Sequence, residues 1–250
     1  MASRKKRGKT AKPRKTPTYM IPQNELRNVQ KIRVYGLALS VMVLIWIVIK
    51  PVPYFIIFPI AFIIPIVSIV LLYRYHEIFA QTRSNSDRIP TEWYPLLLPI
   101  AGLVIRLSIN YDLTSQRVPL TVAGILSITA AIFLIYQLKN LDLKPWEIAI
   151  TAIGILPVFL AYFWSALIFT NCYLDTSDPQ VFPAKVLFKR IEEGDSSDAF
   201  YVDIDAGGPS EPPLQVDVSE DFFDEVGQGD EVTVILKEGT LRFPWYTIKY

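Results

Sequence analysis

The sequence of 250 residues holds very few side chains of the kinds that act as nucleophiles, general bases or soft metal ligands. It contains one histidine, His76, and one cysteine, Cys172. Catalysis of the Ser-His-Asp or Cys-His type needs a histidine beside the nucleophile, and a zinc centre needs several Cys or His ligands. No phosphate-binding or dinucleotide-binding glycine loop is present either. We therefore expect no enzymatic activity, no internal disulfide and no cofactor.

Carboxylates are the one abundant group with potential chemistry, and they gather near the C-terminus. Asp203 and Asp205 lie two residues apart on a predicted strand, with Asp217 on the next one. Oxygen ligands of this kind suit Ca²⁺, but the spacing of a calcium-binding loop is absent. A solvated strand face is the better interpretation, and we expect no metal.

Arg106 is the only ionisable side chain that lies clearly within an apolar run. Such groups are costly in lipid and often mark a binding or transport site. Its long side chain can also reach the polar boundary near Asn110, about 6 Å along a helix. The alternative is that Arg106 and Arg117, across a short loop, bind a lipid phosphate or another anion. Snorkelling is the favoured interpretation.

The surrounding sequence predicts a membrane-spanning helical bundle. Roughly 20 apolar residues are needed to cross about 30 Å of hydrocarbon. About five runs qualify, and short connections predict antiparallel neighbours. They cover residues 34–49, 54–72, 93–110, 119–138 and 146–170, within a membrane domain of residues 25–170.

Charge is sorted along the chain and predicts the orientation. Residues 1–34 carry eleven Lys and Arg against one Glu, whereas residues 171–250 carry seventeen Asp and Glu against six Lys and Arg. Basic segments stay on the cytoplasmic side. We therefore expect a largely disordered basic tail, residues 1–24, inside the cell and the acidic C-terminal domain outside. The tail lacks the features of a nucleic-acid-binding arm.

Small residues form a stripe on the predicted fourth span. Ala123, Ser127 and Ala131 follow one another at four-residue spacing, which places them on one face of a helix. Such a face allows close helix packing. The partner helix belongs either to this chain, which we favour, or to another protein. The second alternative includes a homo-oligomer of this chain.

Residues 176–250 predict a small all-β domain. Polar and apolar residues alternate in five short segments, separated by Gly-rich and Asp-rich turns. Ser219 before an acidic and aromatic run predicts one capped helical turn. The strand number fits an OB-like or SH3-like barrel, or a sandwich.

The C-terminal segment contains a Gly-Asp turn before an alternating strand, Gly229 to Val234, and a Pro-Trp-Tyr ending, Gly239 to Tyr246. In these features it resembles the C-terminal domain of uncharacterised bacterial multi-pass inner-membrane proteins. Arg242 replaces the second glycine of that ending. The resemblance implies a bacterial inner (plasma) membrane location and carries no activity.

Two functional hypotheses follow. The first is a scaffold that presents its acidic β-domain to a protein partner, with Trp245, Tyr246 and Tyr250 as candidate contacts. The second is a transporter or lipid-handling protein with its site near Arg106, in the third to fifth spans. The first is favoured because intramembrane polar groups are scarce.

Overall fold

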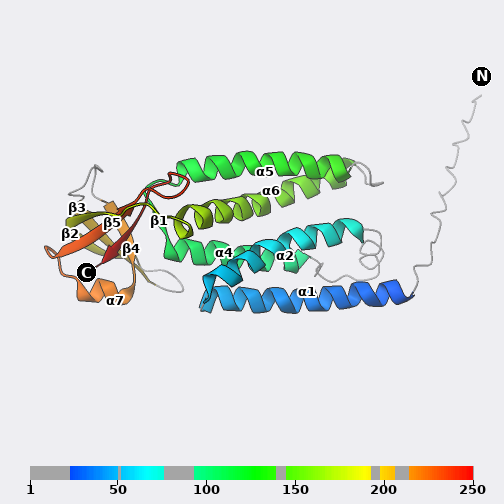
Figure 1. Cartoon of the computed structure of the whole chain (residues 1–250), viewed down its shortest axis with the longest axis horizontal. Helices are drawn as coiled ribbons and strands as arrows, with labels where there is room; N and C mark the ends of the chain where they lie inside the picture. The colour runs from blue at the N-terminus through cyan, green and yellow to red at the C-terminus, as the bar shows by residue number, and fades with distance from the viewer. Residues whose placement is uncertain are drawn as a thin grey trace, which may run out of the picture.

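The computed structural model describes residues 23–49, 52–75, 93–138, 145–192, 198–205 and 214–249. Five long helices lie side by side, and a sheet lies beyond one end of them (Figure 1). The helices are α1 (Gln23–Ile49), α2 (Tyr54–Arg74), α4 (Tyr94–Asn110), α5 (Arg117–Leu138) and α6 (Pro145–Ile168). A π-helical turn, η2 (Phe169–Tyr173), continues α6 toward the sheet.

Four of the described helices are long and apolar enough to cross a membrane, and all five predicted runs are helical. The four candidate spans are Arg27–Ile49, Tyr54–Arg74, Arg117–Gln137 and Ile148–Tyr173. The remaining helix, α4, has 17 residues and is about 25 Å long, less than the roughly 30 Å of a hydrocarbon core. These features suit a multi-pass membrane protein.

The short helix α4 is the centre of the bundle. It contacts α1, α2 and α6, and Leu96, Leu103 and Leu107 on it are fully or almost fully buried. Gly102 brings α4 close to α1, because a Cβ there would lie 3.0 Å from Leu44 Cδ1. The outer helix α5 packs against α6.

The sheet has six antiparallel strands in the order β1-β6-β5-β2-β3-β4. The five predicted strands are confirmed. Their order along the chain is β2 (Gln180–Glu192), β3 (Ala199–Asp205), β4 (Leu214–Val218), β5 (Glu231–Lys237) and β6 (Trp245–Lys249). The sixth, β1 (Asp112–Leu113), comes from the loop between α4 and α5.

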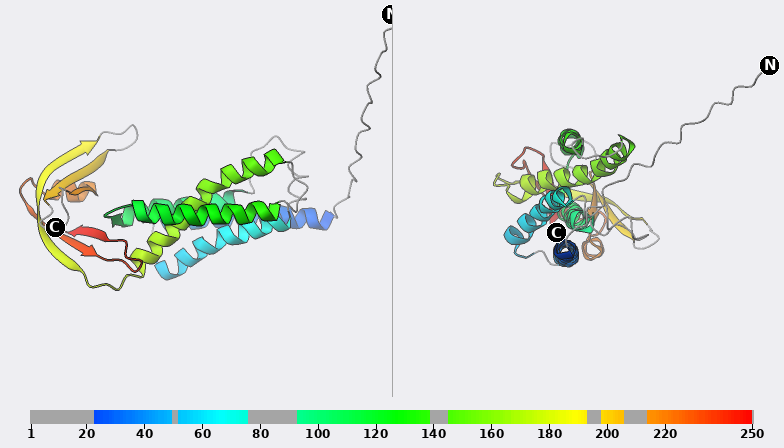
Figure 2. Two further views of the ribbon diagram at one scale, coloured as in Figure 1. Left: turned by 90° about the horizontal axis from the view of Figure 1, so that it is seen from above. Right: turned by 90° about the vertical axis from the view of Figure 1, so that its right-hand side faces the viewer.

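Curvature of the long strand β2 makes the sheet a half-barrel (Figure 2). A shift of register between Val186 and Phe188 marks a bulge, which bends a strand locally. Among the described strands the two outermost, β1 and β4, do not pair with each other. An open curled sheet therefore takes the place of the closed barrel or sandwich considered from the sequence.

A short helix, α7 (Glu220–Glu225), packs against the core of the half-barrel. The Ser219 side chain accepts a hydrogen bond from the Phe222 N–H at 3.2 Å, so the predicted capped turn is confirmed. Phe223 on this helix lies in the same apolar cluster as Val202 and Ile204 of strand β3. The alternation of β3 places these apolar side chains inward and its aspartates outward.

Candidate functional site

The sheet is attached to the helices through one buried amide. Asn171, in the turn η2, has no exposed surface. Its Oδ1 accepts hydrogen bonds from the N–H groups of Leu241 at 3.0 Å and Phe243 at 3.2 Å. Its Nδ2 donates to the Phe243 carbonyl at 2.8 Å, and its backbone carbonyl accepts from the Thr240 N–H at 3.0 Å. One side chain thereby fixes the loop between β5 and β6.

This loop has the backbone conformation that contact with Asn171 requires. Gly239 has φ +77°, and a Cβ there would collide with the Asn171 amide. Arg242 has φ 59°, which is strained for any residue but glycine. Arg242 therefore carries a conformational cost that a glycine at this position would not.

The strand β1 forms a second attachment. Asp112 pairs with Tyr246 and Leu113 with Trp245 at the edge of the sheet. Beside this pairing, the Thr114 N–H and hydroxyl both donate to the Pro244 carbonyl, at 3.0 and 3.1 Å. The loop between α4 and α5 is therefore continuous with the sheet.

Trp245 and Asp175 complete what we call the junction, formed by residues 111–114, 171–177 and 238–246. The Trp245 Nε1–H donates to Asp175 Oδ2 at 2.8 Å. The Trp245 ring packs edge-on against the Tyr111 ring, with 5.4 Å between the ring centroids. Partial burial alone would raise the pKa of Asp175, but hydrogen bonds from Ser177 and Trp245, with the charge of Lys237, lower this pKa below its ordinary value. The carboxylate is therefore favoured in the folded state.

Arg106 lies near the aromatic side chains of Tyr54 and Tyr111. Its Nη2 donates a long hydrogen bond of 3.5 Å to the Tyr54 hydroxyl on α2. The pKa of Tyr111 is raised to about 12, mainly by burial and further by neighbours including Cys172. The positive charge of Arg106 opposes this shift. Arg117 is exposed at the start of α5. The partner found for Arg106 is thus a tyrosine of the same chain, and an anion site shared with Arg117 stays a prediction.

The small-residue stripe of α5 is directed into the bundle. Ala123, Ser127 and Ala131 are all buried, and Ala131 shares an apolar cluster with Ile155 and Phe159 of α6. The Ser127 hydroxyl donates to the Ala123 carbonyl and needs no outside partner. Within this chain the stripe therefore serves the contact between α5 and α6.

The predicted partner contacts stay a prediction, and the structure places two of them. Trp245 is partly exposed and hydrogen-bonded in the junction, whereas Tyr246 is 7% exposed in the core of the sheet. Tyr250 lies outside the described residues. Their roles depend on strand register and on β1, which alternation alone does not reveal.

The face of the sheet directed away from its core, here named the outer face, includes Phe188 and Arg190 of β2 and Asp203 and Asp205 of β3. Phe188 on β2 is 62% exposed and opposes Asp203 of β3. The Arg190 guanidinium lies 3.8 Å from the Asp203 carboxylate. Nearby, Lys185 lies between Asp205 of β3 and Glu231 of β5, its paired residues on either side. The alternation of polar and apolar residues in β2 is the sequence signal for this surface. The bulge between Val186 and Phe188 changes which residues of β2 point outward.

Neither metal chemistry nor known relatives add to this surface. In the part of the chain that the structure describes, no group of three or more His, Cys, Asp or Glu is placed to hold a metal ion. Comparison with protein families, curated proteins and solved structures gave no match to this chain. The function is therefore inferred from the geometry of the junction and the outer face.

Proposed function

We propose that the protein is an integral membrane scaffold whose helices anchor the half-barrel and whose outer face binds a protein partner outside the membrane. The observation that carries this proposal is the exposure of Phe188. Among the described strands it is the one aromatic residue classed as exposed, at 62%. Aromatic side chains surrounded by polar groups are typical of the centres of protein interfaces.

Charge on and around the outer face favours a basic partner. Residues 171–250 carry seventeen Asp and Glu against six Lys and Arg. On the outer face, Asp203 and Asp205 neighbour one another along β3. Complementary charge speeds the encounter with a basic partner and excludes acidic competitors. The aromatic side chain of Phe188, which the partner buries on binding, supplies affinity.

The junction makes this surface suitable for recognition. Asn171, β1 and Trp245 fix the half-barrel to the ends of α4 and α6. A surface held in one orientation loses less conformational freedom when a partner binds. The helices then determine where a partner is placed relative to the bilayer.

Co-purification with substitutions on opposite faces of β2 tests the proposal. Phe188→Ala removes the exposed aromatic, and Ile191→Ala removes a 49% exposed apolar residue from the other face. We expect at least about fivefold less partner recovered with Phe188→Ala, because central interface aromatics contribute more than about 1 kcal/mol. Recovery with Ile191→Ala should match that of the unmodified chain. Equal recovery with both variants would refute a binding site at the outer face.

A further inference from the structure

A second surface, at the opposite end of the molecule, has the form of a lipid site. From their connection near the sheet, α1 and α2 diverge along the bundle (Figure 1). The gap holds a groove of about 410 Å³ with the start of α4 beside it. We call it the α1/α2 groove; its lining residues are Ile32, Arg33, Tyr35, Gly36, Leu39, Ile63, Ile64, Val67, Ser68, Leu71, Leu72 and Pro95.

The walls of this groove are apolar and open to the side of the bundle. Leu39 of α1 is 46% exposed and Val67 of α2 is 47% exposed, so the groove is accessible to surrounding lipid. The Ser68 hydroxyl donates to the Ile64 carbonyl at 2.8 Å, which satisfies it within its own helix. A volume of about 410 Å³ lies within the roughly 300–1,000 Å³ of ligand pockets. Such walls suit a hydrocarbon chain and give a polar solute little to bind.

One end of the groove is basic and lies at the level expected for lipid headgroups. Arg33 lines the groove, and Arg74 lies two residues beyond the lining residue Leu72 in the last turn of α2. Tyr35 and Tyr73 are exposed beside them, as interfacial aromatics are. From Ile49 to Arg33, α1 rises about 24 Å, so Arg33 lies about 6 Å short of the full thickness of a hydrocarbon core, a distance that a long arginine side chain can cover.

We propose that the α1/α2 groove binds an anionic glycerophospholipid, with an acyl chain along the groove and the phosphate at Arg33 and Arg74. Guanidinium groups match the geometry of phosphate oxygens and bind them through paired hydrogen bonds. The site is independent of the outer face, because it lies between different elements at the other end of the bundle. It is also distinct from the surroundings of Arg106.

Titration of the full-length protein with lipid tests the headgroup contact. The purified chain in mild detergent is titrated with phosphatidylglycerol or with phosphatidylcholine of the same acyl chains, and native mass spectrometry counts bound lipid. We expect one phosphatidylglycerol to bind before phosphatidylcholine does. Arg33→Gln and Arg74→Gln should each weaken phosphatidylglycerol binding about fivefold, the contribution of one basic residue near an anionic lipid.

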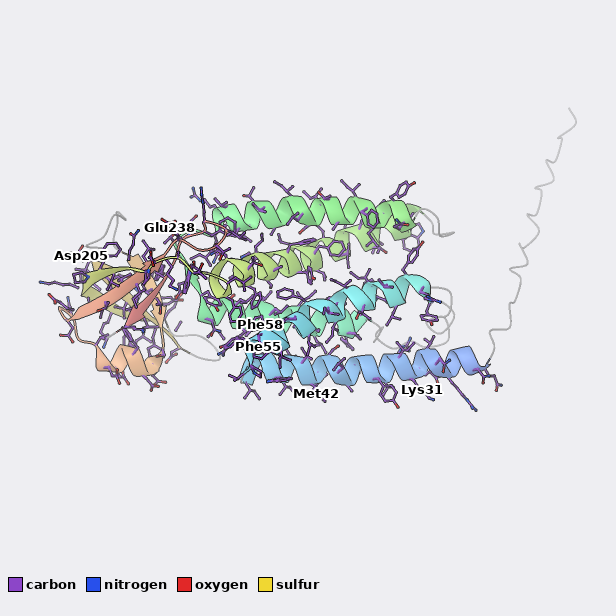
Figure 3. All side chains as sticks on the ribbon, viewed as in Figure 1. Lys31, Met42, Phe55, Phe58, Asp205 and Glu238 are labelled. Carbon is purple, nitrogen blue, oxygen red and sulfur yellow. The ribbon has the colours of Figure 1, made fainter. Side chains whose placement is uncertain are left out.

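Lys31→Gln is the matched charge control, because Lys31 is exposed on the side of α1 away from α2 (Figure 3). We expect this variant to bind phosphatidylglycerol as the unmodified chain does. If Lys31→Gln and Arg33→Gln weaken binding equally, or if the two lipids bind alike to the unmodified chain, a headgroup site at Arg33 is refuted.

Substitutions by tryptophan test the groove itself. Leu39→Trp fills the groove, whereas Met42→Trp adds the same bulk at a 63% exposed position on the face of α1 away from α2. We expect only Leu39→Trp to abolish the bound phosphatidylglycerol, with circular dichroism and gel filtration unchanged in both. Bound lipid in Leu39→Trp equal to that in Met42→Trp would overturn the proposal.

Discussion

Removing the Asn171 side chain should release the half-barrel from the helices. In Asn171→Ala, the N–H groups of Leu241 and Phe243 and the Phe243 carbonyl lose their partner. Each lost hydrogen bond in a partly buried site costs about 1 kcal/mol. Three such bonds give about 3 kcal/mol, which corresponds to roughly a hundredfold change in the local opening equilibrium.

Hydrogen exchange measured by mass spectrometry on peptides covering residues 238–246 is the appropriate assay, because the opening is local. We expect amide hydrogen exchange in this loop to be about a hundredfold faster in Asn171→Ala than in the unmodified chain. The exchange rates of the α4 amides should not change. Ser165→Ala is the matched control: Ser165 is equally buried in α6, and its hydroxyl makes no hydrogen bond among the described residues. Loop exchange in Asn171→Ala as slow as in Ser165→Ala would refute the role of the amide.

Other consequences follow from the junction. Arg242→Gly should raise the free energy of unfolding by up to about 1 kcal/mol in thermal melts, because glycine adopts positive φ without strain; Arg242→Ala should give no such gain. Gly239→Ala should destabilise the junction, since its Cβ collides with Asn171, and faster loop exchange would show it. The lowered pKa of Asp175 stabilises the fold above its ordinary value of 3.8, so this stabilisation should be lost as pH falls below that value; Asp175→Asn should remove that pH dependence.

Most of the secondary structure could be predicted from the sequence because local patterns determine it. Long apolar runs predict the helices, and the Ser219 cap is a local hydrogen bond. Alternation predicts the strands β3 and β5, whose inward residues include Val202 and Val232. Each of these signals lies within the segment that it describes.

The junction could not be predicted because its contacts join distant segments. The two residues of β1 are too few for any periodic signal, and they pair with Trp245 and Tyr246, more than 130 positions later. Asn171 makes its side-chain bonds to residues about 70 positions away. A buried amide at the end of an apolar run has no distinctive spacing, so its role becomes visible only in the fold.

The exposed position of Phe188 could not be predicted for a different reason. Strict alternation from Val186 would direct Phe188 toward the core. The bulge between these residues shifts the phase and turns Phe188 outward. The same shift directs Lys189 inward, where its ammonium lies 4.1 Å from the centre of the Phe223 ring. One inserted residue therefore determines which side chains of β2 the outer face exposes.

Site-specific photo-crosslinking in native membranes tests the central claim most directly. A photoreactive amino acid is placed at Phe188 on the outer face or at Ile191 on the other face of the same strand, both of which are exposed. We expect a discrete crosslinked protein from position 188 and none from position 191. The same crosslinks from both positions, or none from position 188 while the full-length protein is present in the membrane, would contradict recognition through the outer face.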